Sequence, residues 1–291
     1  MGKSLQVAGV SHHETLRRNS MTDWITDYVP GAPRIAYDHC GNGKPVVFLH
    51  GIGGNRSNWH DQLPDFAAAG FHALAWDARG YGLSDDYDGA LDFADFSHDL
   101  ARLLDHLNVR QAHLVGLSMG GRILQDFYPR YPERVKTLVL CDTFPGFDST
   151  FKPEKRAEFV RLRTQALRAG KEPKDIAPAV VETLLGPQAS EAHRQRLLTS
   201  MAALHKDAYI KTVEATAYYD RSADLPNIKV PTLLVYGADD RLTPPKIGRR
   251  MQADIPDAEF VLIAAAGHLV NIEQPHEFNR AVLAFLRAHA D

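Results

Sequence analysis

Short apolar segments alternate with longer amphipathic segments along most of the chain. The runs at 46–50 and 71–76 are almost continuously apolar and have glycine next to them. This pattern is typical of strands that are buried on both faces. The segment 93–107 instead repeats apolar residues at helical spacing, which predicts a helix with one buried face. Strands separated by helices of this length predict an α/β fold with a mostly parallel sheet flanked by helices. The predicted strands are 24–29, 34–40, 46–50, 71–76, 112–115, 135–140, 232–236 and 259–263, and the accompanying helices are 57–69, 93–107, 122–131, 247–255 and 275–290.

The interval 142–231 breaks this alternation because it has helical patterning and no convincing strand. We expect a helical cap here, inserted into an α/β core made of residues 21–141 and 232–291. The first twenty residues are polar and without pattern, so we expect 1–20 to be a flexible extension, and Met21 is an alternative start. Helices are predicted in the cap at 153–169, 174–185, 190–204 and 208–219.

The sequence Gly116-Leu117-Ser118-Met119-Gly120 lies between a predicted strand and a predicted helix. A serine on such a sharp turn sits in strained backbone geometry and presents its hydroxyl above the sheet. Glycine two residues before and two residues after it avoids collisions with neighbouring backbone. The strand, turn and helix order therefore makes Ser118 the candidate nucleophile.

A serine hydroxyl needs a base, and the base needs a third group that holds it. His268 follows the last predicted strand, where a loop carries it over the carboxyl end of the sheet. Asp240 follows the strand 232–236 and precedes His268, which fits the order serine, acid, histidine. Asp142, at the end of the strand 135–140, is the rival acid, and we favour Asp240. The candidate triad is therefore Ser118, Asp240 and His268.

Backbone N–H groups must stabilise the oxyanion in such a reaction. One comes from the residue after the nucleophile, which is Met119, and the second is expected from Ile52 in the glycine-rich loop 50–54. His50 in that loop is interpreted as a structural hydrogen-bonding residue. Asp77 and Arg79, after the strand 71–76, are expected to hold loops together.

Composition excludes several other classes. The chain has 291 residues and a net charge of −3, which argues against nucleic-acid binding. Its only cysteines, Cys40 and Cys141, indicate no disulfide framework, so we expect a cytoplasmic protein. No apolar run approaches the ~20 residues of a membrane span. We find no metal-ligand spacing, phosphate loop or dinucleotide fingerprint, so no metal or cofactor is expected.

The first predicted cap helix is rich in lysine and arginine. A solvated helix face explains this charge without any function. Phe159, Leu162 and Ala166 form the expected apolar stripe, and Arg163 falls on that stripe. An inward Arg163 is the candidate residue for binding a substrate carboxylate.

Five motifs, HGIGG, DARGYGLS, GLSMGG, GADDRLTP and AAGH, occur in an order and spacing that resemble the α/β-hydrolase fold family. The resemblance implies the same triad, the same oxyanion donors and a lid formed by 142–231. Within the family, the chain is most similar to 3-oxoadipate enol-lactonases and related esterases. Arg122 departs from that group, in which an apolar residue is common after GLSMGG.

These observations predict a cofactor-free serine hydrolase that cleaves a small ester, lactone or amide through an acyl-enzyme. The alternatives are hydrolysis of a carbon–carbon bond in a ring-cleavage diketone by the same triad, and a ligand receptor that has lost turnover. The expected partner is a small-molecule substrate, without nucleic acid or membrane. Assembly into a homo-oligomer is left open.

Overall fold

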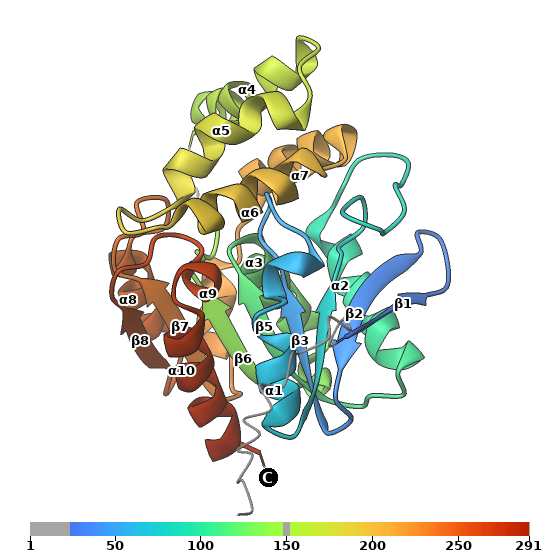
Figure 1. Ribbon diagram of the computed structural model, residues 1–291, viewed down its shortest axis with the longest axis vertical. Helices are drawn as coiled ribbons and strands as arrows, with labels where there is room; N and C mark the ends of the chain where they lie inside the picture. Colours follow the sequence, from blue (N-terminus) through green and yellow to red (C-terminus); the bar gives the residue numbers. More distant parts are fainter. Residues whose placement is uncertain (1–23, 148–151, 291) are drawn as a thin grey trace, which may run out of the picture.

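The computed structural model describes residues 24–147 and 152–290. Its centre is an eight-stranded sheet in the order β1-β2-β4-β3-β5-β6-β7-β8 (Figure 1). Strand β2 pairs antiparallel with both of its neighbours, and all other pairs from β4 to β8 are parallel. The predicted strands are all confirmed: β1 Ile25–Val29, β2 Ile35–Cys40, β3 Lys44–Leu49, β4 Phe71–Trp76, β5 Ala112–Leu117, β6 Val135–Cys141, β7 Thr232–Gly237 and β8 Glu259–Ile263.

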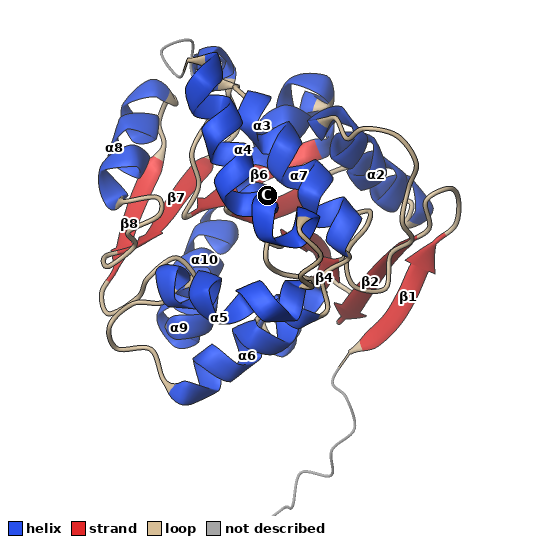
Figure 2. Cartoon of the chain, turned by 90° about the horizontal axis from the view of Figure 1, so that it is seen from above, coloured by secondary structure: helices blue, strands red, loops and turns tan. Residues whose placement is uncertain are grey.

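Helices cover both faces of the sheet, and this explains why the central strands are continuously apolar. Every residue of β5 and β7 is buried. Helices α2, α3 and α8 lie on one face of the sheet and α10 lies on the other, as the view from above shows (Figure 2). Helix α1 packs beside α10. The bounds are α1 Leu63–Ala68, α2 Phe93–His106, α3 Met119–Arg130, α8 Pro245–Asp254, α9 Val270–Glu273 and α10 Pro275–Ala288, with 3₁₀ turns at η1 Arg56–Trp59, η2 Pro132–Arg134 and η3 Ser222–Asn227.

The helix predicted at 57–69 is wrong as a single element, because the segment divides into η1 and α1. Asn55 caps η1 by accepting a hydrogen bond from the backbone N–H of Ser57 at 2.9 Å. Pro64 has no N–H to continue a helix from the preceding turn, and it occupies the first turn of α1 instead. The chain after β3 therefore forms two short helical elements, η1 and α1, in place of one helix.

Between β6 and β7, the described residues form four α-helices, which we call the inserted helices, and then η3. The inserted helices are α4 Pro153–Arg168, α5 Pro173–Leu184, α6 Glu191–Ala202 and α7 Lys206–Tyr218. They lie above the carboxyl ends of the central strands, at the top of Figure 1. Helix α4 packs on α7, and α5 packs on α6. Parallel strands present their carboxyl ends at one edge of the sheet, so the loops after β3, β5, β7 and β8 face these helices.

Within residues 24–147 and 152–290, no helix is both long enough and apolar enough to cross a membrane.

Candidate active site

Ser118 occupies a strained turn between β5 and α3. Its backbone has φ of 52° and ψ of −109°, a combination that non-glycine residues rarely adopt. A Cβ atom at Gly120 would lie 2.2 Å from the carbonyl oxygen of Leu49, and one at Gly116 would lie 2.4 Å from the backbone of Gly120. The two glycines are therefore required by close backbone approach. The strain is held in place by the surrounding sheet, where the Ser118 N–H donates to the Cys141 carbonyl at 2.9 Å.

Asp240 and His268 come together above the ends of β7 and β8. The Nδ1 atom of His268 lies 2.8 Å from Oδ2 of Asp240. Because the carboxylate is an acceptor, Nδ1 carries the proton, and Nε2 is left with a free lone pair. The hydroxyl of Thr243 donates to the same Asp240 oxygen at 2.6 Å. Asp240 and His268 are both buried, so the hydrogen bond between them orients the imidazole in a place shielded from bulk water.

The environment keeps Asp240 ionised. Burial by itself would raise the pKa of this carboxyl, but the positive charge that His268 carries when protonated and the hydrogen bonds from His268 and Thr243 outweigh burial and hold the pKa below its usual value. Its second oxygen accepts the backbone N–H groups of Leu242 at 2.7 Å and Thr243 at 3.0 Å. Asp240 therefore organises its own turn and also orients His268.

Asp142, the rival acid, is buried beside this pair and has a different partner. Its Oδ1 accepts the backbone N–H of Gly237 at 2.8 Å. Burial, and after it the neighbouring charge of Asp240, raise the pKa of Asp142 well above the usual value of a carboxyl. The partner of His268 Nδ1 in this geometry is Asp240.

Ser118 and His268 line one cavity of about 760 Å³ between the sheet and the inserted helices. Gly51 borders Ser118, since a Cβ atom at Gly51 would lie 3.4 Å from the Ser118 Cβ. Most of the remaining wall is apolar, and it includes Leu117, Phe159, Leu184, Met201, Val213 and Leu269. Such a cavity suits a small ligand with an apolar body.

The two expected oxyanion donors are close to Ser118 in the chain or in space. Ile52 lines the cavity in the loop that also carries Gly51. Met119 is the first residue of α3, and the first N–H groups of a helix have no acceptor inside the helix. The positive end of α3 therefore points at the turn that holds Ser118.

His50, Asp77 and Arg79 have the structural roles predicted for them. Nε2 of His50 accepts the backbone N–H of Ala78 at 3.1 Å, while Nδ1 lies 2.8 Å from the carbonyl oxygen of Gly51. This arrangement requires a neutral ring, and burial lowers the pKa of His50 accordingly. Asp77 accepts the backbone N–H of Leu83 at 2.7 Å, and Arg79 pairs with Asp99 at 2.6 Å, so both link loops to the core.

The orientation of α4 differs from the prediction. Leu162, expected on the apolar stripe, is 54% exposed, and the buried residues of this helix are Thr164 and Leu167. Arg163 is exposed overall, and its role in substrate binding stays a prediction. Its guanidinium lies 3.8 Å from the ring centroid of Phe159, and both residues line the cavity. The buried stripe is rotated because α4 packs on α7, a contact that no local pattern reveals.

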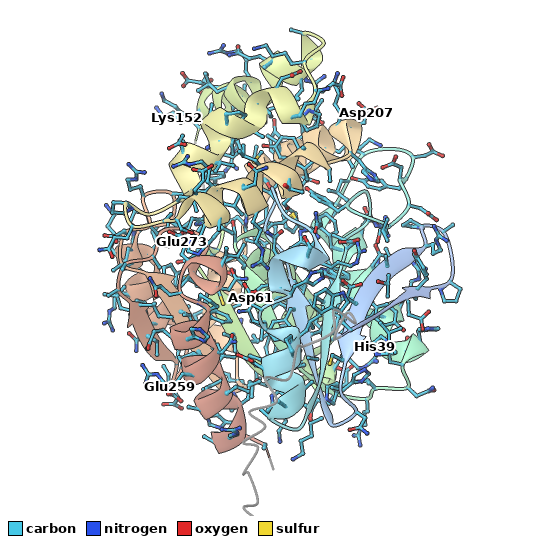
Figure 3. The ribbon with its side chains drawn as sticks, in the orientation of Figure 1. His39, Asp61, Lys152, Asp207, Glu259 and Glu273 are labelled. Carbon is cyan, nitrogen blue, oxygen red and sulfur yellow. The ribbon has the colours of Figure 1, made fainter. Side chains whose placement is uncertain are left out.

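Glu273, in α9, was not identified from the sequence. It is labelled in Figure 3 at the level where the core meets the inserted helices. Its carboxylate accepts three backbone N–H groups: Gly267 at 3.0 Å and Leu269 at 3.3 Å on either side of His268, and Gly186 at 2.8 Å just after α5. The same side chain therefore fixes the His268 loop and the end of α5. No motif marks it, because all its partners are backbone groups.

Among the residues that the structure describes, no group of three or more histidine, cysteine, aspartate or glutamate side chains is arranged to hold a metal ion.

The chain belongs to the alpha/beta hydrolase family, whose model matches residues 46–281. A 2-hydroxy-6-oxononadienedioate/2-hydroxy-6-oxononatrienedioate hydrolase from Burkholderia vietnamiensis is 33% identical over 87% of this chain and 91% of its own length. A thermophilic esterase from Thermogutta terrifontis, solved with malate bound, superposes with a TM-score of 0.82 at 28% identity, covering 91% of this chain and 98% of the esterase. The enol-lactonase from Burkholderia xenovorans superposes with a TM-score of 0.78 at 27% identity, covering 90% and 100% of the two chains.

Proposed function

We propose that this enzyme of the alpha/beta hydrolase family is a serine hydrolase that cleaves a small ester or lactone, or an amide, through an acyl-enzyme. The observation that carries the proposal is the geometry above β5, β7 and β8. Ser118 sits on a strained turn and shares a cavity with His268, whose Nδ1 is held by Asp240 at 2.8 Å. A solved esterase and a solved enol-lactonase of similar fold support the choice of substrate class.

In the first half of the reaction, the Ser118 oxygen attacks the carbonyl carbon and His268 Nε2 takes the hydroxyl proton. The resulting oxyanion is stabilised by the N–H groups of Met119 and Ile52. The bond to the leaving oxygen, or to the leaving nitrogen of an amide, then breaks, and His268 returns the proton to that atom. Asp240 stabilises the imidazolium during these steps and keeps the correct nitrogen facing Ser118.

In the second half, water attacks the acyl carbon while His268 accepts a proton from that water. The bond to the Ser118 oxygen breaks and this oxygen regains its proton from His268. The products are a carboxylic acid and an alcohol from an ester, a hydroxy acid from a lactone, or a carboxylic acid and an amine from an amide. Groups of the chain stabilise each charge that develops in the cycle and transfer each proton, and no cofactor enters a step.

Carbon–carbon bond hydrolysis is the second candidate function. It is favoured by the relative from Burkholderia vietnamiensis, which is named for hydrolysis of a hydroxy-oxo-dienedioate and spans nearly the same length. The same serine, histidine and oxyanion groups serve that reaction, with a carbon atom in place of the leaving oxygen. The two candidates differ in substrate and share their machinery.

A panel of short esters, lactones, amides and ring-cleavage diketones tests the proposal under steady-state conditions. We expect many turnovers per protein on an ester or lactone, and turnover slower by about 10⁴-fold or more with Ser118→Ala. Preferential turnover of a diketone assigns the second candidate instead. Release of at most one equivalent of product on every compound identifies a receptor and overturns both.

A further inference from the structure

Arg122 lies one helical turn after Ser118 on α3, and its side chain is buried. Only 4% of the residue is exposed, and it lines the same cavity as Ser118 and His268. Within the described part of the chain, its Nε and Nη1 atoms have no hydrogen-bond partner. An unpaired guanidinium in such a place is costly, since buried charges are otherwise paired.

Three aromatic rings lie close to this guanidinium but give its Nε and Nη1 atoms no hydrogen-bond acceptor. The Arg122 Cζ atom lies 4.7 Å from the ring centroid of Phe144, 5.8 Å from that of Phe93 and 6.0 Å from that of Tyr219. The Tyr219 hydroxyl donates to the backbone carbonyl of Arg122 at 2.6 Å. Ring faces stabilise a cation by a smaller amount than a carboxylate does, and they leave its N–H groups unsatisfied.

The charge of Arg122 persists at neutral pH and is not the only positive charge at the cavity. Burial lowers the pKa of Arg122 to about 10, and the charge of Arg163 contributes in the same direction. Both arginines line the cavity, while its described lining contains no aspartate or glutamate. The cavity is therefore apolar with a positive wall, a combination that favours an anion with an apolar body.

We propose that Arg122 anchors a carboxylate of the substrate, so that the substrate class is an anionic ester or lactone such as a monoester of a dicarboxylic acid. This inference rests on the proposed function for the reacting group, but the anion site itself does not require turnover. Ser118 immediately precedes α3, and the backbone N–H of Arg122 donates to the Ser118 carbonyl at 3.2 Å, so the two residues are one turn apart. The anchored carboxylate therefore lies on the Ser118 side of α3, a short apolar linker away from the carbonyl under attack. The planar guanidinium binds it through two N–H groups.

A kinetic test compares monomethyl glutarate with dimethyl glutarate, two substrates that differ by one carboxylate charge. The corresponding pairs of succinate and adipate esters vary the length of the linker between the carboxylate and the ester. For the preferred linker, Arg122→Met should lower the ratio of kcat/KM on the monoester to that on the diester by about 30-fold or more, the effect of truncating one partner of a buried charge pair. Arg122→Lys, which retains the charge, should restore part of the ratio. Equal losses on both substrates would mean that Arg122 only packs against the rings, and would overturn the proposal.

A binding test separates the anion site from the reaction. In the Ser118→Ala background, calorimetry should show that the dicarboxylate of the preferred linker binds about 30-fold or more tightly than its neutral diamide, and that adding Arg122→Met abolishes the difference. Arg161→Met, on an exposed part of α4 and hydrogen-bonded to Gln165, is the matched control and should retain the preference. If Arg122→Met fails to fold, the comparison of dicarboxylate and diamide is made on Ser118→Ala with Arg163→Ala added, where the preference should persist because Arg122 is the remaining arginine of the described lining. Equal binding overturns the anion site, whereas preferential dicarboxylate binding without turnover of any ester overturns only the proposed function.

Discussion

The two sides of the cavity are built by different means. On the core side, Ser118, Asp240 and His268 follow strands of one buried sheet. The backbone N–H of Ser118 donates to Cys141 on β6, that of Asp240 donates to Gly237 in its own turn, and that of His268 donates to Leu184 at the end of α5. On the opposite side, α4 buries only Thr164 and Leu167 along its length. The core therefore holds the reacting groups in a fixed geometry, while α4 forms part of the opposite wall with few buried side chains and rests on α7, which buries six residues.

This difference teaches where chemistry and selectivity are decided. A reacting group displaced by about 1 Å loses a large part of its rate, so the reactive side chains must be held by a rigid scaffold. A wall that only selects the substrate tolerates more variation, as loops and insertions on a common fold generally do. Arg122 is an exception, because it is a candidate substrate-binding residue held by the rigid core. The predictions below test this division, from the largest expected effect to the smallest.

Ser118→Ala removes the nucleophile from the rigid side. We expect kcat to fall by about 10⁴-fold or more, because the members of a triad act as a unit. The fold should remain, since the serine side chain is small and the strain lies in the backbone. Steady-state kinetics together with circular dichroism measure both. Turnover close to that of the wild type would contradict the serine-hydrolase mechanism.

Asp240→Asn should lower kcat by about 10³–10⁴-fold, because an amide favours the wrong tautomer of His268. The matched control is Asp142→Asn, a change of the same kind in a neighbouring buried carboxyl. We expect the control to reduce kcat far less, since Asp142 bonds to Gly237. The opposite order of effects would assign the acid to Asp142.

Asp142→Asn should change how stability depends on pH. The native pKa of Asp142 is raised, so over the range from the ordinary carboxyl pKa up to the native pKa the folded chain holds a proton that the unfolded chain has lost. Stability from this group therefore falls as pH rises through that range, by about 1.4 kcal/mol per pH unit. The variant should lack this slope and be more stable than the wild type at the upper end. Urea unfolding at several pH values checks it, and parallel curves for the two proteins would contradict the raised pKa.

Glu273→Gln should loosen the junction between the two sides. An amide group presents only one acceptor oxygen, so at least one of the N–H groups of Gly186, Gly267 and Leu269 loses its partner. We expect the free energy of unfolding to fall by about 1–3 kcal/mol, the cost of leaving a buried polar group unsatisfied. Glu277→Gln, an exposed change on α10 that breaks only a surface pair with Arg280, is the control. Equal effects of the two substitutions in denaturant unfolding would refute a linking role for Glu273.

Arg163→Ala should have the smallest effect, because this arginine is exposed at the edge of the cavity. An exposed charge pair contributes about 0.2–1 kcal/mol, so kcat/KM on an anionic ester should fall by about 1.5- to 5-fold. A neutral ester should change less, and raising the salt concentration should reduce the difference. A loss on the anionic ester as large as that of Arg122→Met would move the anion site to the inserted helices.

The sequence by itself determined the strands of the core, their mostly parallel arrangement and the candidate reactive residues. Gly116 and Gly120 are required by contacts within the turn and with the adjacent strand, so a short motif records them. Asp240 and His268 were found because parallel strands end at one edge of a sheet, which brings together residues that directly follow such strands. These are local or topological constraints, and they leave a pattern in the chain.

Tertiary structure alone decided which charges and faces are buried. The burial of Arg122 without a hydrogen-bond partner, the exposure of Arg163 and the rotation of α4 all depend on how the inserted helices pack on one another and on the core. The role of Glu273 can be recognised only from its three backbone partners in the folded structure, two of them next to His268 and one after α5. Burial and pairing are properties of contacts between distant segments, and amino-acid spacing within one segment carries no record of them.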